Sequence, residues 1–129
     1  MTKLLKTLEL AQAGVLYAPA SFLTANYDQL LDVCNGCGAA NAKFDFVPDR
    51  IYGTYIGHAC NIHDWMYDNG RTIEDKEEAD RVFLNNTYRL IERDKHKWYK
   101  PTWLQRIRAR EYYQAVKMFG GSAYWAGKN

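Results

Sequence analysis

The chain has few cysteines, no long apolar run and almost no net charge, and each of these shortages excludes a class of protein. Three cysteines in 129 residues are too few for a disulfide-rich secreted scaffold, and the odd count leaves at least one of them unpaired within the chain. No stretch approaches the roughly twenty apolar residues that a membrane-spanning helix needs. A formal charge of +2 does not require a nucleic-acid partner.

The length and composition are those of one globular domain over residues 1–129. The hydrophobic fraction of 47% and the charged fraction of 25% are ordinary, and no internal repeat or low-complexity linker divides the chain. The charge is uneven, however. Residues 64–92 hold eight acids and four bases (net −4), whereas residues 93–117 hold eight bases and two acids (net +6). One half therefore suits a cation, and the other is basic and aromatic.

The N-terminal segment combines features of a signal peptide with features of an ordinary helix. It has basic residues, leucines and an Ala-Pro-Ala, but Glu9 and Gln12 interrupt the apolar region that a signal peptide needs. We therefore interpret residues 3–16 as an amphipathic helix. The leucines that share one of its faces are Leu4, Leu5 and Leu8. This leaves the localisation open between, for example, a secreted and a virion- or phage-associated protein.

The rest of the pattern predicts an all-α domain built on an antiparallel helix hairpin, about 50–69 and 73–94. Apolar positions follow the helical period in the first segment, and Gly70 suits the left-handed position that ends it. Thr72 is placed to cap the second helix, whose first turn is acidic as the helix dipole favours. Strand signals are scarce.

The flanking regions complete this prediction. Residues 17–33 are predicted to be an irregular connection, and residues 34–49 a turn-forming loop rich in glycine and asparagine. A last helix is expected to begin near Pro101 and to end at Gly120. The second helix of the hairpin is expected to bury Ala79, Val82, Phe83, Leu90 and Ile91.

Within the hairpin, His63 and Asp80 are predicted to face each other. His63 lies six residues before Asn69 and Asp80 seven after Ile73, so at 1.5 Å rise per residue they stand about 9 and 10.5 Å from the turn. A carboxylate there accepts a hydrogen bond from one ring nitrogen and leaves the other as a base, as in hydrolytic sites. Tyr67, one turn after His63, is placed to hold the same carboxylate.

Asp64 points about 100° away from His63 around the helix axis, toward a ridge of small residues. The ridge consists of Gly53, Gly57, Cys60 and Asn61. Another backbone can approach closely on this side, and the segment 34–40 is the natural candidate. A loop that offers main-chain carbonyls beside a carboxylate suits calcium. A cation near His63 would polarise a substrate carbonyl.

These residues resemble the secreted phospholipase A2 superfamily. The stretch CNIHDWMY, residues 60–67, resembles the active-site helix of that family. Residues 35–38, Asn-Gly-Cys-Gly, resemble its calcium loop, and the helix that carries Asp80 resembles its second catalytic helix. The resemblance covers roughly residues 34–90, and it is nearest to the bacterial and viral branches, which have few or no disulfides.

The resemblance implies calcium-dependent hydrolysis of the sn-2 ester of a glycerophospholipid, at a membrane surface or micelle. His63 would deprotonate a water, Asp80 would orient His63, and Tyr67 would support Asp80. The oxyanion would be stabilised by calcium and the backbone N–H of Gly38. The implied calcium ligands are the carboxylate of Asp64, the carbonyls of Gly36, Gly38 and Ala40, and the side chain of Asn35.

The resemblance also implies two structural features. One is a disulfide between Cys37 and Cys60. The other is an acyl-chain channel whose mouth is lined by Leu4, Leu5 and Leu8. A catalytically inert binding module with the same architecture is an alternative to an active lipase.

A zinc site is a second interpretation of the same region. Cys34, Cys37, Cys60 and His63 have the spacing of a tetrahedral zinc site. Such a site would make the chain a small zinc-binding structural or interaction protein. It would account for all three cysteines but not for Asp64, Tyr67 or the position of Asp80.

The basic tract from residue 95 to residue 110 has a third set of interpretations. Lysines and arginines alternate here with Trp98, Tyr99 and Trp103. Such a tract is a solvated helix face, a surface for nucleic acid or a partner protein, or, if the resemblance holds, a membrane-docking surface. With the resemblance we expect no nucleic-acid partner, and the oligomeric state stays open.

Overall fold

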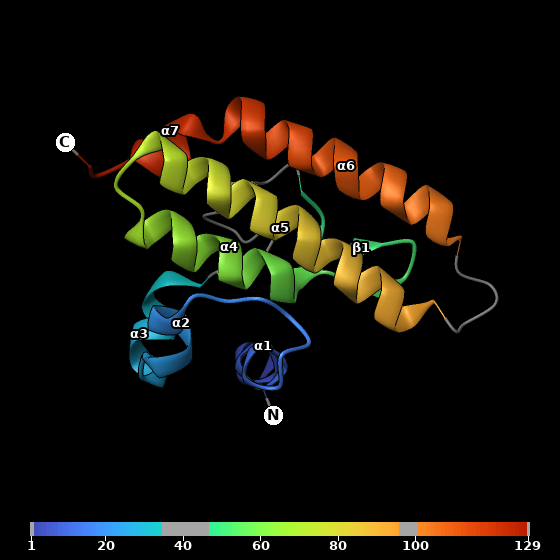
Figure 1. Cartoon of the computed structure of the whole chain (residues 1–129), viewed down its shortest axis with the longest axis horizontal. Coiled ribbons are helices and arrows are strands. Elements are labelled where there is room, and N and C mark those ends of the chain that lie inside the picture. Colours follow the sequence, from blue (N-terminus) through green and yellow to red (C-terminus); the bar gives the residue numbers. More distant parts are fainter. Residues whose placement is uncertain (1, 35–46, 96–100, 129) are drawn as a thin grey trace.

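Two antiparallel helices, α4 (Gly57–Asn69) and α5 (Ile73–Asp94), form the centre of the fold (Figure 1). The structure is a computed structural model that describes residues 2–34, 47–95 and 101–128. Helix α6 (Thr102–Phe119) packs along α5, and α1 (Lys3–Gln12) packs against α4. The order across the molecule is therefore α6, α5, α4, α1. The shorter described elements are α2 (Ala20–Thr24), α3 (Tyr27–Val33), β1 (Arg50–Ile51), β2 (Thr54–Tyr55) and α7 (Gly121–Trp125).

The described residues are mainly helical, which confirms the predicted all-α class. The start of α5 shows why the local prediction succeeded. The Thr72 hydroxyl accepts a hydrogen bond from the backbone N–H of Asp75 (3.1 Å), and the Asp75 carboxylate accepts one from the N–H of Thr72 (3.2 Å). This reciprocal capping box satisfies two N–H groups that the helix itself leaves unpaired.

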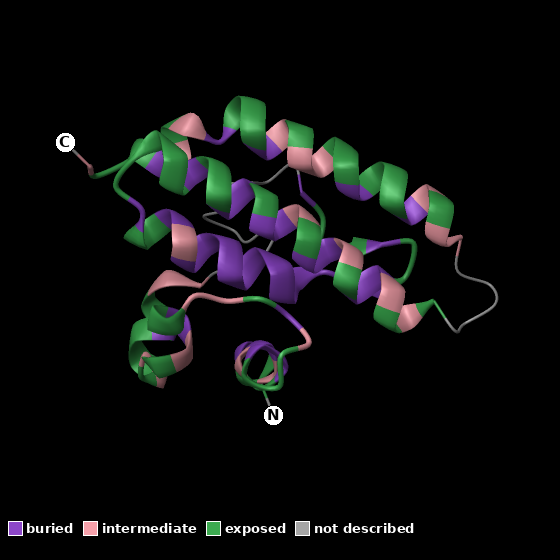
Figure 2. Ribbon diagram, viewed as in Figure 1, coloured by how far each residue is buried: buried purple, intermediate pink, exposed green. Residues whose placement is uncertain are grey.

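Helix α4 lies in the interior, as its almost continuous burial in Figure 2 shows. It is covered on one side by α5 and on the other by α1. The five α5 residues predicted to be buried are all in the core: Ala79, Val82, Phe83, Leu90 and Ile91. No helix in the described part of the chain has the length and apolar character needed to cross a membrane.

The prediction of a helix from residue 50 was wrong for its first seven residues. Here β1 and β2 pair antiparallel, with Arg50 opposite Tyr55 and Ile51 opposite Thr54. Tyr52 and Gly53 link them with φ angles of 45° and 87°, the two positive angles of a tight hairpin turn. The apolar residues of this segment are spaced as in a helix, but the turn reverses the chain before a helix can begin.

The boundaries of α1 and the segment after it also differ from the prediction. Helix α1 ends at Gln12 rather than at residue 16, and Gly14 follows with a φ of 79°. Residues 17–33 are not an irregular connection, because they contain α2 and α3. The Asn26 side chain accepts from the N–H of Gln29 at 2.9 Å and caps α3, so a short capped helix was present in the sequence and was missed.

Gly70 ends α4 as predicted, but not in the left-handed conformation. Its φ of −72° and ψ of 155° are extended. A Cβ at Gly70 would lie 2.5 Å from the hydroxyl oxygen of Tyr124, so glycine is needed for a close approach and not for its backbone angles. Tyr124 belongs to α7, which begins directly after α6 ends at Phe119 and which the sequence did not predict.

Candidate functional site

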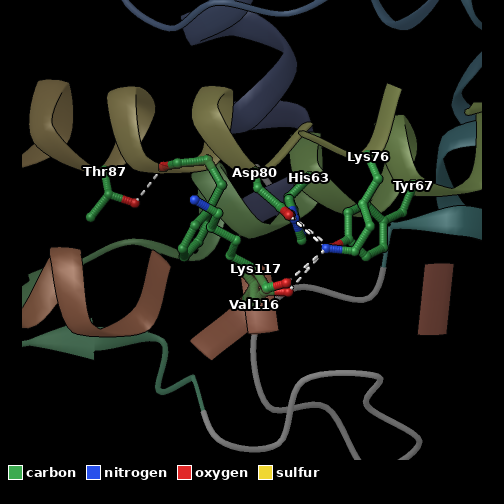
Figure 3. Close-up of polar contacts among 8 residues, drawn as sticks. His63, Tyr67, Lys76, Asp80, Thr87, Val116 and Lys117 are labelled. Atoms are coloured by element: carbon green, nitrogen blue, oxygen red, sulfur yellow. Dashed lines mark hydrogen bonds and ion pairs between the residues drawn. The ribbon is translucent and has the colours of Figure 1, made fainter. Parts of the chain in front are cut away.

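Asp80 is the centre of a buried polar cluster between α4, α5 and α6. Its exposed fraction is 1%, and three side chains donate hydrogen bonds to it (Figure 3). His63 Nε2 lies 2.8 Å from Oδ1, the Tyr67 hydroxyl donates to Oδ1 at 2.7 Å, and Lys76 Nζ donates to Oδ2 at 2.8 Å. The predicted hydrogen bond across the hairpin is therefore present, and Tyr67 holds the same carboxylate.

These donors keep Asp80 ionised inside the protein. Burial by itself would raise the pKa of the carboxyl group, but the hydrogen bonds from His63, Lys76 and Tyr67 outweigh burial and lower the pKa of Asp80. An ionised carboxylate accepts hydrogen bonds and donates none. Nε2 of His63 therefore carries a proton, and in the neutral ring the basic lone pair is on Nδ1.

The imidazole of His63 is fixed by packing as well as by Asp80. The residue is 2% exposed, and its ring centroid lies 4.1 Å from that of Tyr67 and 5.2 Å from that of Phe83. His63 and Tyr67 come from successive turns of α4, and Phe83 comes from the facing side of α5. The ring is thus held in one orientation by two helices, as an oriented base requires.

Lys76 is the member of the cluster that sequence reasoning missed. It is 5% exposed, and its ammonium also donates to the backbone carbonyls of Val116 and Lys117, each at 3.3 Å. These carbonyls belong to the last turn of α6, the negative end of the helix dipole, where a cation is favoured. The spacing from Lys76 to Asp80 is one helical turn, which was a readable signal. It was overlooked because Lys76 lies in a highly charged stretch that looks solvated.

Tyr67 is supported by the C-terminal part of the chain. Its ring contacts that of Tyr124 edge-on, with centroids 5.1 Å apart, and its backbone carbonyl accepts a hydrogen bond from Lys128. The Tyr124 hydroxyl in turn donates to the carbonyl of Thr72 at 2.5 Å. Burial, followed by the negative charge of Asp80, raises the pKa of Tyr67, so its hydroxyl stays a neutral donor. Helix α7 therefore closes one side of the cluster.

Asp64 lies on a different face of α4 and is also buried, with 4% of its surface exposed. It is near Cys34, the residue that follows α3. Cys34 is a free cysteine, and its pKa is raised to about 12 by burial and then by the negative charges of Asp64 and Asp68. Asp64 thus lies close to the end of α3.

The remaining residues of the predicted metal and oxyanion site lie outside the described residues. They are Asn35, Gly36, Cys37, Gly38 and Ala40. Cys60 is disulfide-bonded, as predicted, whereas its predicted partner Cys37 and the calcium ligands of the loop stay predictions. Asp64 offers the hard oxygen donor that calcium prefers, so the one predicted ligand that can be located fits calcium.

The zinc hypothesis fits less well. Three of its four ligands, Cys34, Cys60 and His63, are within the described residues. Among those residues, no group of three or more histidines, cysteines and acidic residues is arranged to hold a metal ion. A tetrahedral zinc site needs all of its ligands about 2.0–2.3 Å from one ion. Cys60 is disulfide-bonded, so it offers no thiolate to such a site.

The predicted surface residues are only partly described. On α1, Leu4 is in the core, Leu8 is partly buried against it, and Leu5 is 38% exposed. On α6, Trp103 is 68% exposed, whereas Trp98 and Tyr99 lie outside the described residues. The acyl-channel and membrane-docking roles stay predictions.

Comparison with known proteins identified no relative of this chain. No family model matches the chain, and no curated protein and no solved structure is significantly similar to it. The functional interpretation therefore depends on the geometry of the Asp80 cluster, on the position of Asp64 and on the motif at residues 60–67.

Proposed function

We propose that the protein is a calcium-dependent phospholipase A2-like hydrolase that cleaves the sn-2 ester of glycerophospholipids. The observation that supports this proposal most strongly is the hydrogen bond between His63 Nε2 and Asp80 Oδ1 inside the hairpin. It is the arrangement of a general base and its orienting carboxylate, and it leaves Nδ1 as the proton acceptor. The choice of a phospholipid ester follows from the resemblance of residues 60–67 to the active-site helix of that family.

In the proposed reaction, Nδ1 of His63 removes a proton from a water molecule as its oxygen attacks the ester carbonyl carbon. The resulting imidazolium is stabilised by the negative charge of Asp80, which is stronger in a buried site than in water. The proton then passes to the oxygen of the departing lysophospholipid, and the fatty acid is released. Tyr67 and Lys76 hold the Asp80 carboxylate in position throughout.

Calcium, when bound, would polarise the ester carbonyl and stabilise the oxyanion that forms from it. Asp64 is the described residue that would hold it. The predicted carbonyl ligands, Gly36, Gly38 and Ala40, would complete the site together with Asn35, and the N–H of Gly38 would donate to the oxyanion.

Release of fatty acid from vesicles of phosphatidylcholine labelled at the sn-2 position tests this proposal. We expect release in millimolar calcium, a return to background in chelator, and no release from an sn-1 label. Release that is independent of calcium, or equal at both positions, would contradict it.

The inert binding module is tested in the same samples. If the protein sediments with vesicles in calcium but releases no fatty acid, it binds phospholipid without turnover, and the enzymatic part of the proposal fails. The buried cluster would then be a structural element of the hairpin.

A further inference from the structure

A polar cavity lies at the beginning of α4, apart from the Asp80 cluster. Its volume is about 260 Å³, and it is bounded by the β1–β2 hairpin, the first turn of α4 and the last turn of α5. Its polar lining comes from Arg50, Tyr55, His58, Arg93 and Asp94. A water molecule takes about 30 Å³ of liquid volume, so the cavity has room for a small oxyanion.

His58 is buried and is one of the residues that line this cavity. The residue is 9% exposed, and its Nδ1 lies 2.6 Å from the Thr7 hydroxyl. That hydroxyl also lies 3.0 Å from the carbonyl of Lys3 and accepts from the Asn61 amide at 3.0 Å. The hydroxyl has one proton: given to Lys3 it leaves Nδ1 as the donor and the lone pair on Nε2, and given to Nδ1 it leaves the ring proton on Nε2.

Nε2 of His58 has no hydrogen-bond partner among the described residues, yet it is not sealed in the protein. The one enclosed side-chain polar atom without a partner in the described ranges is Oε1 of Gln105. His58 lines the cavity, and its Nε2 is accessible because it is not an enclosed atom. An accessible ring nitrogen beside the cavity can form a hydrogen bond with a molecule held there.

The cavity lining holds two exposed arginines, Arg50 and Arg93, and one acid, Asp94. Arg93 forms no ion pair with any carboxylate of the described residues, and the guanidinium of Arg50 lies over the Tyr55 ring, 5.4 Å from its centroid. The acidic group in the lining, Asp94, accepts a hydrogen bond from the Thr54 hydroxyl at 2.9 Å. The net charge of the lining therefore favours an anion.

Helix α1 adds two further cations near His58. Burial, followed by the positive charges of Lys6, Arg93 and Lys3, lowers the pKa of His58 to about 4. Lys6 is paired with Glu9 at 2.8 Å, and the Lys3 ammonium lies over the Tyr55 ring at 4.4 Å. An anion in the cavity would offset these positive charges and so favour protonation of His58.

The hydroxyl of Tyr55 supplies a neutral donor. A Cβ at Gly57 would lie 2.0 Å from the Tyr55 hydroxyl oxygen, so the absence of a side chain at Gly57 lets the hydroxyl rest on the first turn of the helix. Burial raises the pKa of Tyr55 and keeps it a donor.

We propose that this cavity is a phosphate-binding site in which Arg50, Arg93 and the Tyr55 hydroxyl hold the oxygens of a phosphate group and His58 Nε2 contacts one of them. The ligand is inorganic phosphate or the phosphate monoester head of a lipid, which present the same oxygens. The site does not depend on the proposed ester hydrolysis, because none of its residues belongs to the Asp80 cluster.

Isothermal titration with inorganic phosphate at low ionic strength tests the site directly. We expect the wild type to bind and Arg93→Gln to bind at least about tenfold more weakly, since a charge-assisted hydrogen bond is lost. Arg50→Gln should also weaken binding. Arg89→Gln is the matched control, because Arg89 is an exposed arginine one turn earlier on α5 and does not line this cavity. It should stay within about twofold of the wild type.

A second measurement follows the His58 ring by NMR. The pKa of His58 should rise when phosphate is added to the wild type and should not change with phosphate in Arg93→Gln. Sedimentation with phosphatidylcholine vesicles that contain phosphatidic acid then identifies the source of the phosphate. Binding that needs the vesicle, and that Arg93→Gln abolishes, assigns the site to a lipid head group.

Two results would overturn the proposal. One is the absence of binding to both inorganic phosphate and phosphatidic acid vesicles. The other is an equal loss of affinity in Arg89→Gln and Arg93→Gln, because equal losses would mean a diffuse basic surface in place of a built site.

Discussion

At the scale of single residues, Asp80 and Lys76 form a charged pair that is almost completely buried. Their side chains are 1% and 6% exposed, and the two atoms of the ion pair, Oδ2 and Nζ, are 2.8 Å apart. Removing two charges from water is costly, and removing one partner is costlier still because it leaves the other charge buried and unpaired. The pair should therefore matter far more for stability than the exposed ion pairs of the same helix.

Replacement of Lys76 by methionine tests this difference. The variant keeps a long apolar side chain but leaves Asp80 without its ammonium partner and α6 without the contact to Val116 and Lys117. We expect its free energy of unfolding, measured in urea, to fall by about 3–5 kcal/mol. In Lys95→Met, which breaks an exposed pair with Glu92, the change should stay below about 1 kcal/mol. Equal effects in the two variants would refute a buried pair.

His58 should make stability depend on pH. Its folded-state pKa of about 4 lies below the ordinary value of 6.5, so between these values the unfolded chain binds more protons at this residue than the folded protein does. Stability is therefore lost as the pH falls from 6.5 toward 4. Between pH 7 and pH 5 the expected loss is roughly 2 kcal/mol.

Urea unfolding of the wild type and of His58→Gln at both pH values checks this expectation. Glutamine preserves a hydrogen-bonding group toward Thr7 but does not titrate. The variant should be less stable overall and should lose less stability than the wild type on acidification. An equal pH dependence in the two proteins would show that His58 titrates normally in the folded state.

At the scale of secondary-structure elements, the Tyr124 side chain docks the short helix α7 against the turn between α4 and α5. The Tyr124 hydroxyl lies over Gly70 and donates to the carbonyl of Thr72 at 2.5 Å. Gly70→Ala would bring a methyl group within 2.5 Å of that hydroxyl oxygen. We expect thermal denaturation to show a loss of about 1–3 kcal/mol.

Gly121→Ala is the control for this prediction. Gly121 begins α7, and a Cβ there meets no atom within 4 Å, so alanine should leave stability unchanged or raise it slightly. If Gly70→Ala were as stable as the wild type, Tyr124 would have room to move, and α7 would not be fixed by this contact.

The elements that sequence predicted correctly are those with local signals. Helix α5 has a capping box at Thr72 and a regular apolar period, and its start and end were both predicted. The hairpin at residues 50–55 and helix α7 depend instead on distant contacts. The Gln105 amide of α6 donates to the Ile51 carbonyl at 2.9 Å and to the Thr54 hydroxyl at 2.8 Å, and no pattern within the hairpin itself reveals this support.

At the scale of the whole molecule, the candidate site could be predicted in part because a short turn fixes the register of two antiparallel helices. Equal distances from the turn place His63 beside Asp80, and the helical period places Tyr67 beside both. Lys76 also lies one helical turn from Asp80, but its ammonium is held as well by a carbonyl at the end of α6, forty residues later in the chain. The contacts between the cluster and α6 therefore could not be predicted from local sequence patterns.

The arrangement of the molecule also separates three buried polar regions. The Asp80 cluster lies between α4, α5 and α6, Asp64 faces the end of α3, and the phosphate site proposed here lies at the start of α4. Substitutions in one region should therefore leave the function of the others intact. This independence allows the base and the metal ligand of the proposed reaction to be tested one at a time.

The rate of calcium-dependent fatty-acid release by wild type and His63→Gln, with calcium binding and unfolding measured on the same samples, tests the central claim most directly. We expect His63→Gln to remain folded, to bind calcium as the wild type does and to hydrolyse at least about 100-fold more slowly, because only the general base is lost. Asp64→Asn should instead lose calcium binding. Undiminished hydrolysis by a folded His63→Gln variant would contradict the assignment of His63 as the base, and with it the proposed function.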